Sequence, residues 1–168
     1  RAKMLVPGAK SNAAHQKLAQ WEQQGKLKAI VTQNIDGLHQ AAGSKNVLEL
    51  HGSVHRNYCE RCGKFYDFDF MLHSTGVPRC SCGGIVKPDV VLYEESLDQK
   101  TLNAAVRFIA EADMLIIGGT SLNVYPAAGL IHYYRGHKLV LINKSAVSQD
   151  LSADLVITDP IGETLAQL

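Results

Sequence analysis

Four cysteines grouped in one short stretch constrain the fold of this chain more than any other feature. They form two close pairs, Cys59-x-x-Cys62 and Cys80-x-Cys82, with seventeen residues between them. Two such pairs can bring four thiolates to the corners of a tetrahedron, the geometry that Zn²⁺ prefers. Four protein ligands leave no coordination position open, so the predicted zinc is structural rather than catalytic. The alternative is four ordinary thiols or two disulfides.

The clustering also bears on the compartment. Disulfides of a secreted miniprotein would be spread through a short, loop-rich chain, whereas these cysteines lie together inside a 168-residue chain that is 46% hydrophobic. This favours metal ligation in a reducing environment, and we expect a cytoplasmic protein.

Outside this cluster, short apolar runs alternate with amphipathic stretches. The predicted strands cover residues 28–32, 47–50, 114–117, 138–142 and 155–157. The predicted helices cover residues 12–24 and 99–111, and a further helix begins near Pro126. Strands that are apolar on both faces and alternate with helices indicate a parallel sheet that is covered on both sides. We therefore expect an α/β fold, a Rossmann-like parallel sheet with helices on both faces plus a small zinc-binding module.

The domain boundaries follow from a change in composition. Residues 58–86 contain all four cysteines among aromatics and glycines, with little helical or strand periodicity. We expect this stretch to be an inserted module within a Rossmann-like domain made of residues 1–57 and 87–168, a size that suits one domain with an insert. The chain begins at Arg1 rather than at methionine, so we expect a shortened form whose N-terminal part is missing.

The net charge of +1 gives no electrostatic reason to expect binding to nucleic acid or to a membrane surface. No apolar run approaches the roughly 20 residues that span a bilayer. We expect neither partner.

Polar residues follow several predicted strands at the position where ligands bind in doubly wound sheets. The run Gly118-Gly119-Thr120-Ser121 follows one strand, and Asn143 follows another. The glycines would let the backbone approach a phosphate or a ribose, and the hydroxyls would donate hydrogen bonds. Alone, the glycine run is equally consistent with an ordinary turn, and Asn143 is more typical of a turn than of a ligand site. Their shared position at predicted strand ends favours a binding site for both.

The polar run Gln33-Asn34-Ile35-Asp36 after the strand 28–32 is less common. It can form a cluster of amide and carboxylate groups, or a loop that stabilises itself by Asx turns. His51 follows the strand 47–50, and its ordinary pKa near neutrality would suit a general base. The chain has seven histidines, so composition does not select this one.

Five motifs together resemble the sirtuin family. They are TQNIDGLH (residues 32–39), LHG (50–52), the two cysteine pairs, KPDVV (87–91) and GTSLNVYPAA (119–128). Their order and spacing match across nearly the whole chain.

The resemblance implies an NAD-dependent protein-lysine deacylase that acts on acyl-lysine proteins or peptides and releases nicotinamide and O-acyl-ADP-ribose. It implies His51 as the general base, acting with Asn34 and Asp36. It implies that the peptide is held by the Val91 backbone, with Tyr93 lining the acyl channel. The implied NAD-binding residues are Gln33, Asn34, Ile35, Asp36, Gly119, Thr120, Ser121, Asn143, Lys144, Ser145 and Ile161.

Two departures from the family pattern matter. Glu94 stands where the family usually has glycine, which predicts a restricted backbone and an altered substrate preference. The family's Gly-Ala-Gly-x-Ser phosphate loop is absent, so we expect this polypeptide to bind NAD poorly.

Three other functions stay open. A sirtuin-like protein ADP-ribosyltransferase would use the same pocket, and a non-catalytic NAD- or peptide-binding module would keep it without turnover. The Rossmann-like pattern alone would also allow a dehydrogenase, but the cysteine module and the TQNID run argue against it.

Overall fold

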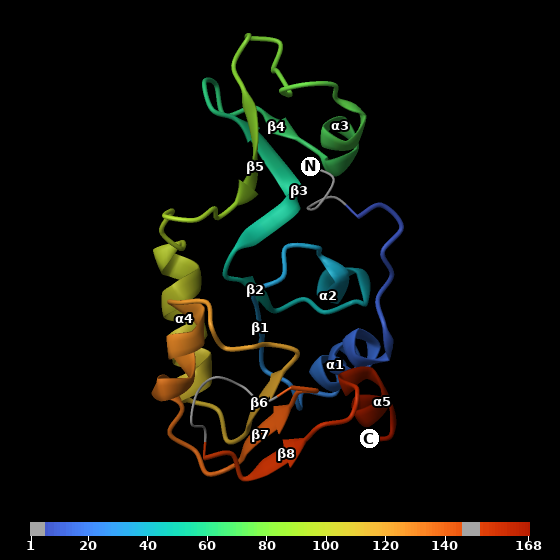
Figure 1. Cartoon of the computed structure of the whole chain (residues 1–168), viewed down its shortest axis with the longest axis vertical. Coiled ribbons are helices and arrows are strands. Elements are labelled where there is room, and N and C mark those ends of the chain that lie inside the picture. Colours follow the sequence, from blue (N-terminus) through green and yellow to red (C-terminus); the bar gives the residue numbers. More distant parts are fainter. Residues whose placement is uncertain (1–5, 146–151) are drawn as a thin grey trace.

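The computed structural model describes residues 6–145 and 152–168. Its helices are α1 (Ala13–Gln23), α2 (Leu38–Ala41), α3 (Phe68–His73), α4 (Gln99–Ala110), the 3₁₀ helix η1 (Ala127–Tyr133) and α5 (Ile161–Ala166). Its strands are β1 (Ile30–Thr32), β2 (Val47–Glu49), β3 (Gly52–Cys59), β4 (Phe65–Tyr66), β5 (Val86–Val90), β6 (Leu115–Gly118), β7 (Leu139–Ile142) and β8 (Leu155–Ile157). The molecule is elongated, with β3, β4, β5 and α3 at one end and β6, β7 and β8 at the other (Figure 1).

The parallel strands confirm the predicted fold class. β1 pairs with β2, and β6, β7 and β8 pair in that order, all parallel. Within the described residues these strands form two hydrogen-bonded sets rather than one. All five predicted strands are present, and each lies within a residue or two of its predicted bounds.

Helices cover both faces of the β6–β7–β8 sheet, as the two-sided apolar pattern predicts. On one face Ile117 packs against Ala128 of η1, and α4 in turn packs against η1. On the other face Ile142 packs against Ala14 of α1 and Leu165 of α5. Figure 1 shows α1 and α5, from opposite ends of the chain, side by side.

The helix starts follow local capping chemistry, with one difference from the prediction. Asn12 caps α1, because its side-chain oxygen accepts a hydrogen bond from the backbone N–H of His15 at 3.1 Å. The helix expected from Pro126 is instead a short 3₁₀ helix with Pro126 as its cap. Its backbone makes i→i+3 bonds, such as the bond from the N–H of Gly129 to the carbonyl of Pro126 at 3.0 Å.

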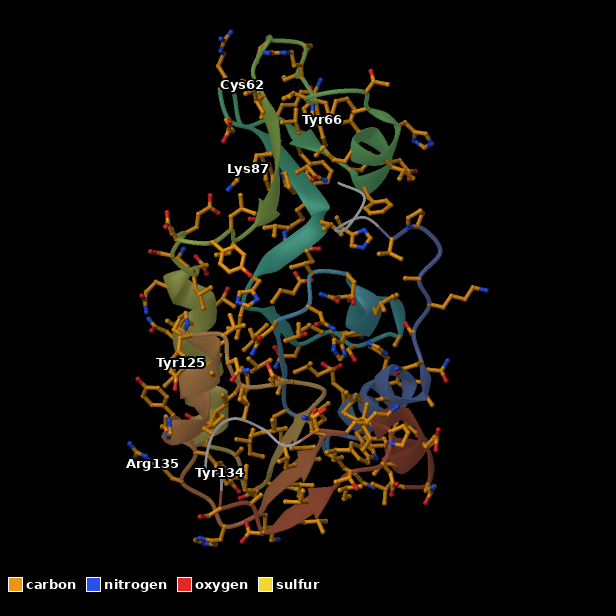
Figure 2. All side chains as sticks on the ribbon, in the orientation of Figure 1. Cys62, Tyr66, Lys87, Tyr125, Tyr134 and Arg135 are labelled. Atoms are coloured by element: carbon orange, nitrogen blue, oxygen red, sulfur yellow. The ribbon has the colours of Figure 1, made fainter. Side chains whose placement is uncertain are left out.

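The antiparallel sheet β4–β3–β5 carries the cysteine-rich stretch. Figure 2 shows Cys62 and Tyr66 at this end of the molecule and Tyr134 and Arg135 at the opposite end. The predicted boundary after residue 57 falls inside β3, which runs on to Cys59, and the division into two domains stays a prediction. Within residues 6–145 and 152–168, no helix combines the length and the apolar character needed to cross a membrane.

Candidate active site and metal centre

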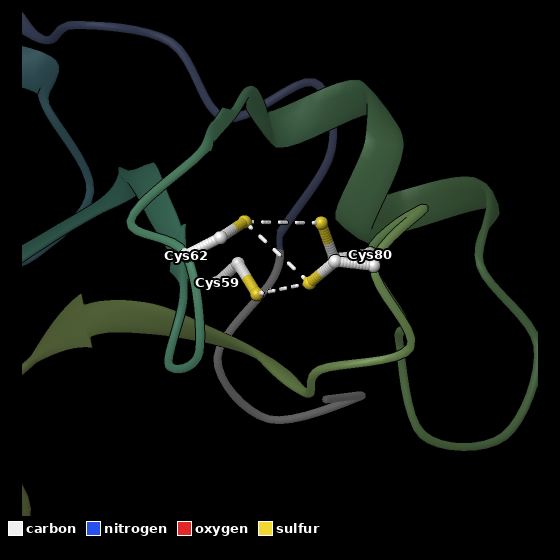
Figure 3. A group of neighbouring side chains, drawn as sticks. Cys59, Cys62 and Cys80 are labelled. Carbon is white, nitrogen blue, oxygen red and sulfur yellow. Dashed lines mark hydrogen bonds between the residues drawn. The ribbon is translucent and has the colours of Figure 1, made fainter.

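The four cysteines come together at the tip of the antiparallel sheet. Their Sγ atoms all lie within 4.8 Å of one another. The Sγ separations are 3.5 Å between Cys59 and Cys82, 3.6 Å between Cys62 and Cys80, and 3.5 Å between Cys62 and Cys82 (Figure 3). A tetrahedron with sulfur atoms about 2.3 Å from a zinc ion has edges of about 3.8 Å, so the group fits a structural Zn²⁺.

The four thiols do not ionise equally without a metal ion. The backbone N–H of Cys82 and the hydroxyl of Tyr66 lower the pKa of Cys80 to about 5. The backbone N–H of Lys64 favours the thiolate of Cys62, but the crowding by the neighbouring cysteines outweighs it and raises that pKa to about 12. Four thiolates therefore do not ionise together unless a positive ion offsets their repulsion, which a zinc ion does.

A cleft of about 720 Å³ lies at the carboxyl ends of β6 and β7. Its lining includes these predicted cofactor residues: Gly119, Thr120, Ser121, Asn143, Lys144, Ser145 and Ile161. Ile161, at the start of α5, lies directly over Gly118 at the end of β6, where any side chain on residue 118 would collide with it. The carboxyl ends of parallel strands form one edge of a sheet, which explains why residues so distant in sequence line one cleft.

The cleft also includes polar residues that the sequence analysis missed. Asn12 at the start of α1, and Asp159 and Glu163 near the start of α5, line it. For Asp159 a signal existed, because it stands two residues after the predicted strand 155–157, at the strand-end position used for the other residues. Asn12 was predicted only as a helix cap, and nothing in the local sequence placed it in the cleft.

The loop of residues 33–37 is held by its own side chains. The N–H of Asn34 donates to the hydroxyl of Thr32 at 3.1 Å, and the N–H of Leu38 donates to a carboxylate oxygen of Asp36 at 3.0 Å. The second bond is the Asx turn that the sequence left as an alternative. It uses one acceptor site of the carboxylate and leaves others, because an ionised carboxylate offers about four.

His51 lies against this loop in a defined tautomer. Its Nδ1 is 3.0 Å from the backbone carbonyl of Gln33. A carbonyl only accepts, so Nδ1 carries the hydrogen and Nε2 of the neutral ring holds a lone pair. His51 is half-buried, and its backbone carbonyl accepts a hydrogen bond from the N–H of Val91 at 3.1 Å. The structure therefore brings His51, Gln33 and Val91 together.

The turn after Val91 is strained and projects into solvent. The N–H of Glu95 donates to the carbonyl of Leu92 at 3.1 Å, and Glu94, the third residue of this turn, has a φ of 72°. That is the type II position that favours glycine, so the predicted backbone restriction at Glu94 appears as strain. Tyr93 is 99% exposed, and its predicted place beside the acyl group stays a prediction.

A histidine pair lies beside Asp36. The rings of His15 and His39 are 4.6 Å apart. Burial lowers the pKa of both side chains, and for His39 the nearby His15 lowers the pKa further, against a weaker opposing effect of Asp36. Both rings are therefore neutral at pH 7.

Comparison with known proteins gives consistent matches over the chain. The Sir2 family model matches residues 1–126. An NAD-dependent protein deacetylase of Clostridium acetobutylicum is 65% identical over 167 residues, which is 98% of this chain and 68% of that protein.

Two solved structures of similar fold are complexes with ligands. One is Sir2 with a p53 peptide and NAD⁺, with a TM-score of 0.87, 41% identity, and coverage of 95% of this chain and 69% of that one. The other is Sir2 with the inhibitor EX-527, 2′-O-acetyl-ADP-ribose and a deacetylated p53 peptide, with a TM-score of 0.87, 39% identity, and coverage of 95% and 71%.

Proposed function

Because this chain belongs to the Sir2 family, we propose that it is an NAD-dependent protein-lysine deacetylase that releases nicotinamide and O-acyl-ADP-ribose. Its substrates are acyl-lysine proteins or peptides, which fits the peptide complexes of the similar solved structures. Zinc would be structural in this activity, because the four cysteines would supply all four ligands of a tetrahedral ion.

The residues of the large cleft fit the adenosine and phosphate half of NAD. Gly119, Thr120 and Ser121 offer backbone and hydroxyl donors at the end of β6, and Asn143 offers an amide at the end of β7. Lys144, Ser145 and Ile161 complete the proposed set. When bound, NAD supplies the electrophilic ribose carbon and accepts the acyl group.

The loop of residues 33–37 fits the nicotinamide half. We assign Gln33, Asn34, Ile35 and Asp36 to this side because their loop is fixed by local hydrogen bonds and lies against His51. The acceptor sites left on the Asp36 carboxylate suit the N–H groups of a carboxamide. A pocket that excludes water here would protect the reactive ribose from hydrolysis.

The orientation of His51 is the observation that carries the proposal. Its Nδ1–H is committed to the carbonyl of Gln33, so Nε2 is the atom that takes a proton from a ribose hydroxyl. The acyl oxygen of the substrate is itself the nucleophile, so the chain needs no serine or cysteine nucleophile. The backbone of Val91 is tied to His51, which supports its assignment to the peptide that presents the lysine.

The cellular setting is inferred from chemistry alone. Four cysteines that serve as metal ligands need a reducing compartment, and we infer that the protein works in the cytoplasm. The near-neutral net charge supports the expectation that neither nucleic acid nor a membrane is a direct partner.

The test is incubation of the purified protein with a saturating concentration of NAD and an acetyl-lysine peptide, followed by mass spectrometry of peptide, nicotinamide and O-acetyl-ADP-ribose. The matched variants are His51→Tyr and His137→Tyr, the second an exposed histidine in the turn before β7. We expect deacetylation to disappear in His51→Tyr and to persist in His137→Tyr.

Two results would contradict the proposal. ADP-ribose left on a protein, with the peptide still acetylated, would indicate a transferase. Binding of NAD without turnover of acetyl, succinyl or long-chain acyl peptides would indicate a binding module.

A further inference from the structure

An irregularity in β3 turns one side chain out of the sheet toward the proposed nicotinamide loop. In the β3–β5 ladder Ser53 pairs with Asp89, but Asn57, four residues further on, pairs with Pro88, only one residue back. Residues 54–56 therefore bulge out of regular pairing. Bulges of this kind redirect side chains and are frequent beside active sites.

His55 lies in this bulge and contacts the loop of residues 33–37 directly. Its Nε2 is 2.9 Å from the backbone carbonyl of Asp36. Because a carbonyl only accepts, Nε2 carries the hydrogen, and this holds for the neutral ring and for the imidazolium alike.

The ring of His55 also fits against the backbone of Gly37. A Cβ on Gly37 would lie 2.8 Å and 3.0 Å from two ring atoms of His55, and the φ of Gly37 is +70°. A side chain on residue 37 would therefore displace the imidazole, and the positive φ itself favours glycine. The loop and the ring are fitted to each other.

His55 also contacts α3, at the metal-binding end of the molecule. Its ring centroid is 5.1 Å from that of Phe68, the first residue of α3. Met71 and Phe70 of the same helix pack against Cys59 and Cys80. One imidazole therefore connects the part of the chain that zinc organises to the part that holds Asp36.

We propose that His55 is a positioning residue for the deacetylation reaction. It connects the loop of residues 33–37 to the metal-binding end of the molecule. This contact holds the loop in the conformation that the nicotinamide half of NAD needs. The expected effect of His55 on deacetylation rests on the proposed function. Its stabilisation of the loop of residues 33–37 does not. His55 acts through the backbone of Asp36, beside the main-chain bond from Val54 to Ile35, and has no chemical step of its own.

Three substitutions separate the hydrogen bond from the ring. His55→Ala removes both, His55→Phe keeps an aromatic ring beside Phe68 without the donor, and His55→Gln keeps an N–H donor of similar reach. One net hydrogen bond corresponds to about a three- to tenfold change. We expect kcat/KM for NAD to fall by that factor in His55→Ala and His55→Phe, with the KM for the peptide unchanged, and His55→Gln to restore it.

His73→Ala is the matched control. His73 is also exposed and also bonds a backbone carbonyl at 2.9 Å, that of Asp69, but it lies on α3 away from the loop. We expect this variant to keep the wild-type kcat/KM for NAD. A loss as large as that in His55→Ala would overturn the proposal.

Amide hydrogen exchange tests the structural claim independently of turnover. We expect faster exchange at Asn34 and Leu38 in His55→Ala and His55→Phe, but not in His55→Gln or His73→Ala. Wild-type exchange and wild-type NAD kinetics in His55→Phe would overturn the proposal. If the wild-type protein is inactive while exchange follows this order, the proposed function fails and the positioning role of His55 stands.

Discussion

Substitution of Gly52 by alanine should lower both the stability of the fold and the activity that depends on His51, the proposed general base. Gly52 follows His51, has a φ of +74°, and begins β3 opposite β5. A Cβ at this position would lie 2.9 Å from the carbonyl carbon of Asp89 and closer still to its oxygen. The two strands have to separate before alanine fits.

Two costs add in this variant. Alanine in the left-handed region costs about 1 kcal/mol. Forcing a backbone shift in a packed region costs about 1–3 kcal/mol more. We therefore expect the free energy of unfolding to fall by about 3 kcal/mol, measured by urea denaturation.

The effect on activity comes from the bond between the strands. The backbone carbonyl of His51 accepts the N–H of Val91 from the chain just after β5, so separation of the strands moves His51, the proposed general base. A displacement of about 1 Å in a reacting group can cost about 100-fold in rate. We expect a loss of that order in kcat for deacetylation.

Gly25→Ala is the control. Its φ is +73°, but among the described residues no atom would lie within 4 Å of an added Cβ, so only the conformational cost of about 1 kcal/mol applies. Subtracting it isolates the cost of moving the strands. Equal losses of stability in the two variants, with kcat intact in Gly52→Ala, would refute the close-approach argument.

Three further predictions concern other parts of the molecule. Glu94→Gly removes a left-handed non-glycine residue, so the free energy of unfolding measured by urea denaturation should rise by about 1 kcal/mol. Cys62→Ser removes one of four thiolates, so the zinc content measured by a colorimetric assay should fall from one ion per chain to near none. Burial and the nearby His15 lower the pKa of His39 below 6.5, so the folded state binds fewer protons than the unfolded state. The stability from His39 is present above pH 6.5 and is lost as pH falls through the lowered pKa, and His39→Gln should flatten that slope.

Each of these predictions has its own contrary outcome. Glu94→Ala keeps the strained backbone, so a gain in Glu94→Ala equal to that in Glu94→Gly would show that charge rather than φ is responsible. A full zinc ion retained by Cys62→Ser would remove Cys62 from the ligand set. An unchanged slope of stability between about pH 7 and 5 in His39→Gln would show that other groups titrate there.

Local patterns determined much of this protein. The spacing of Cys59, Cys62, Cys80 and Cys82 predicted the metal group, because the members of a close pair stay near each other in any fold. The polar residues after the strands 114–117 and 138–142 predicted the cleft, because parallel strands end at a common edge. A run of apolar residues is sufficient to locate a buried strand, and β8 matches its prediction fully.

Only the tertiary structure decided the finer features of the site. The tautomer of His51 depends on a carbonyl eighteen residues away, and the proposed role of His55 depends on a bulge that appears only when β3 pairs with β5. The β3–β5 pairing itself was not predicted, because its ladder joins segments separated by the cysteine-rich stretch. Composition and periodicity report which residues are buried, whereas hydrogen-bond partners across long sequence separations are set by the packing of whole elements. Local sequence patterns therefore predicted which residues form the candidate site, and the packing of the folded chain determined how their atoms are oriented.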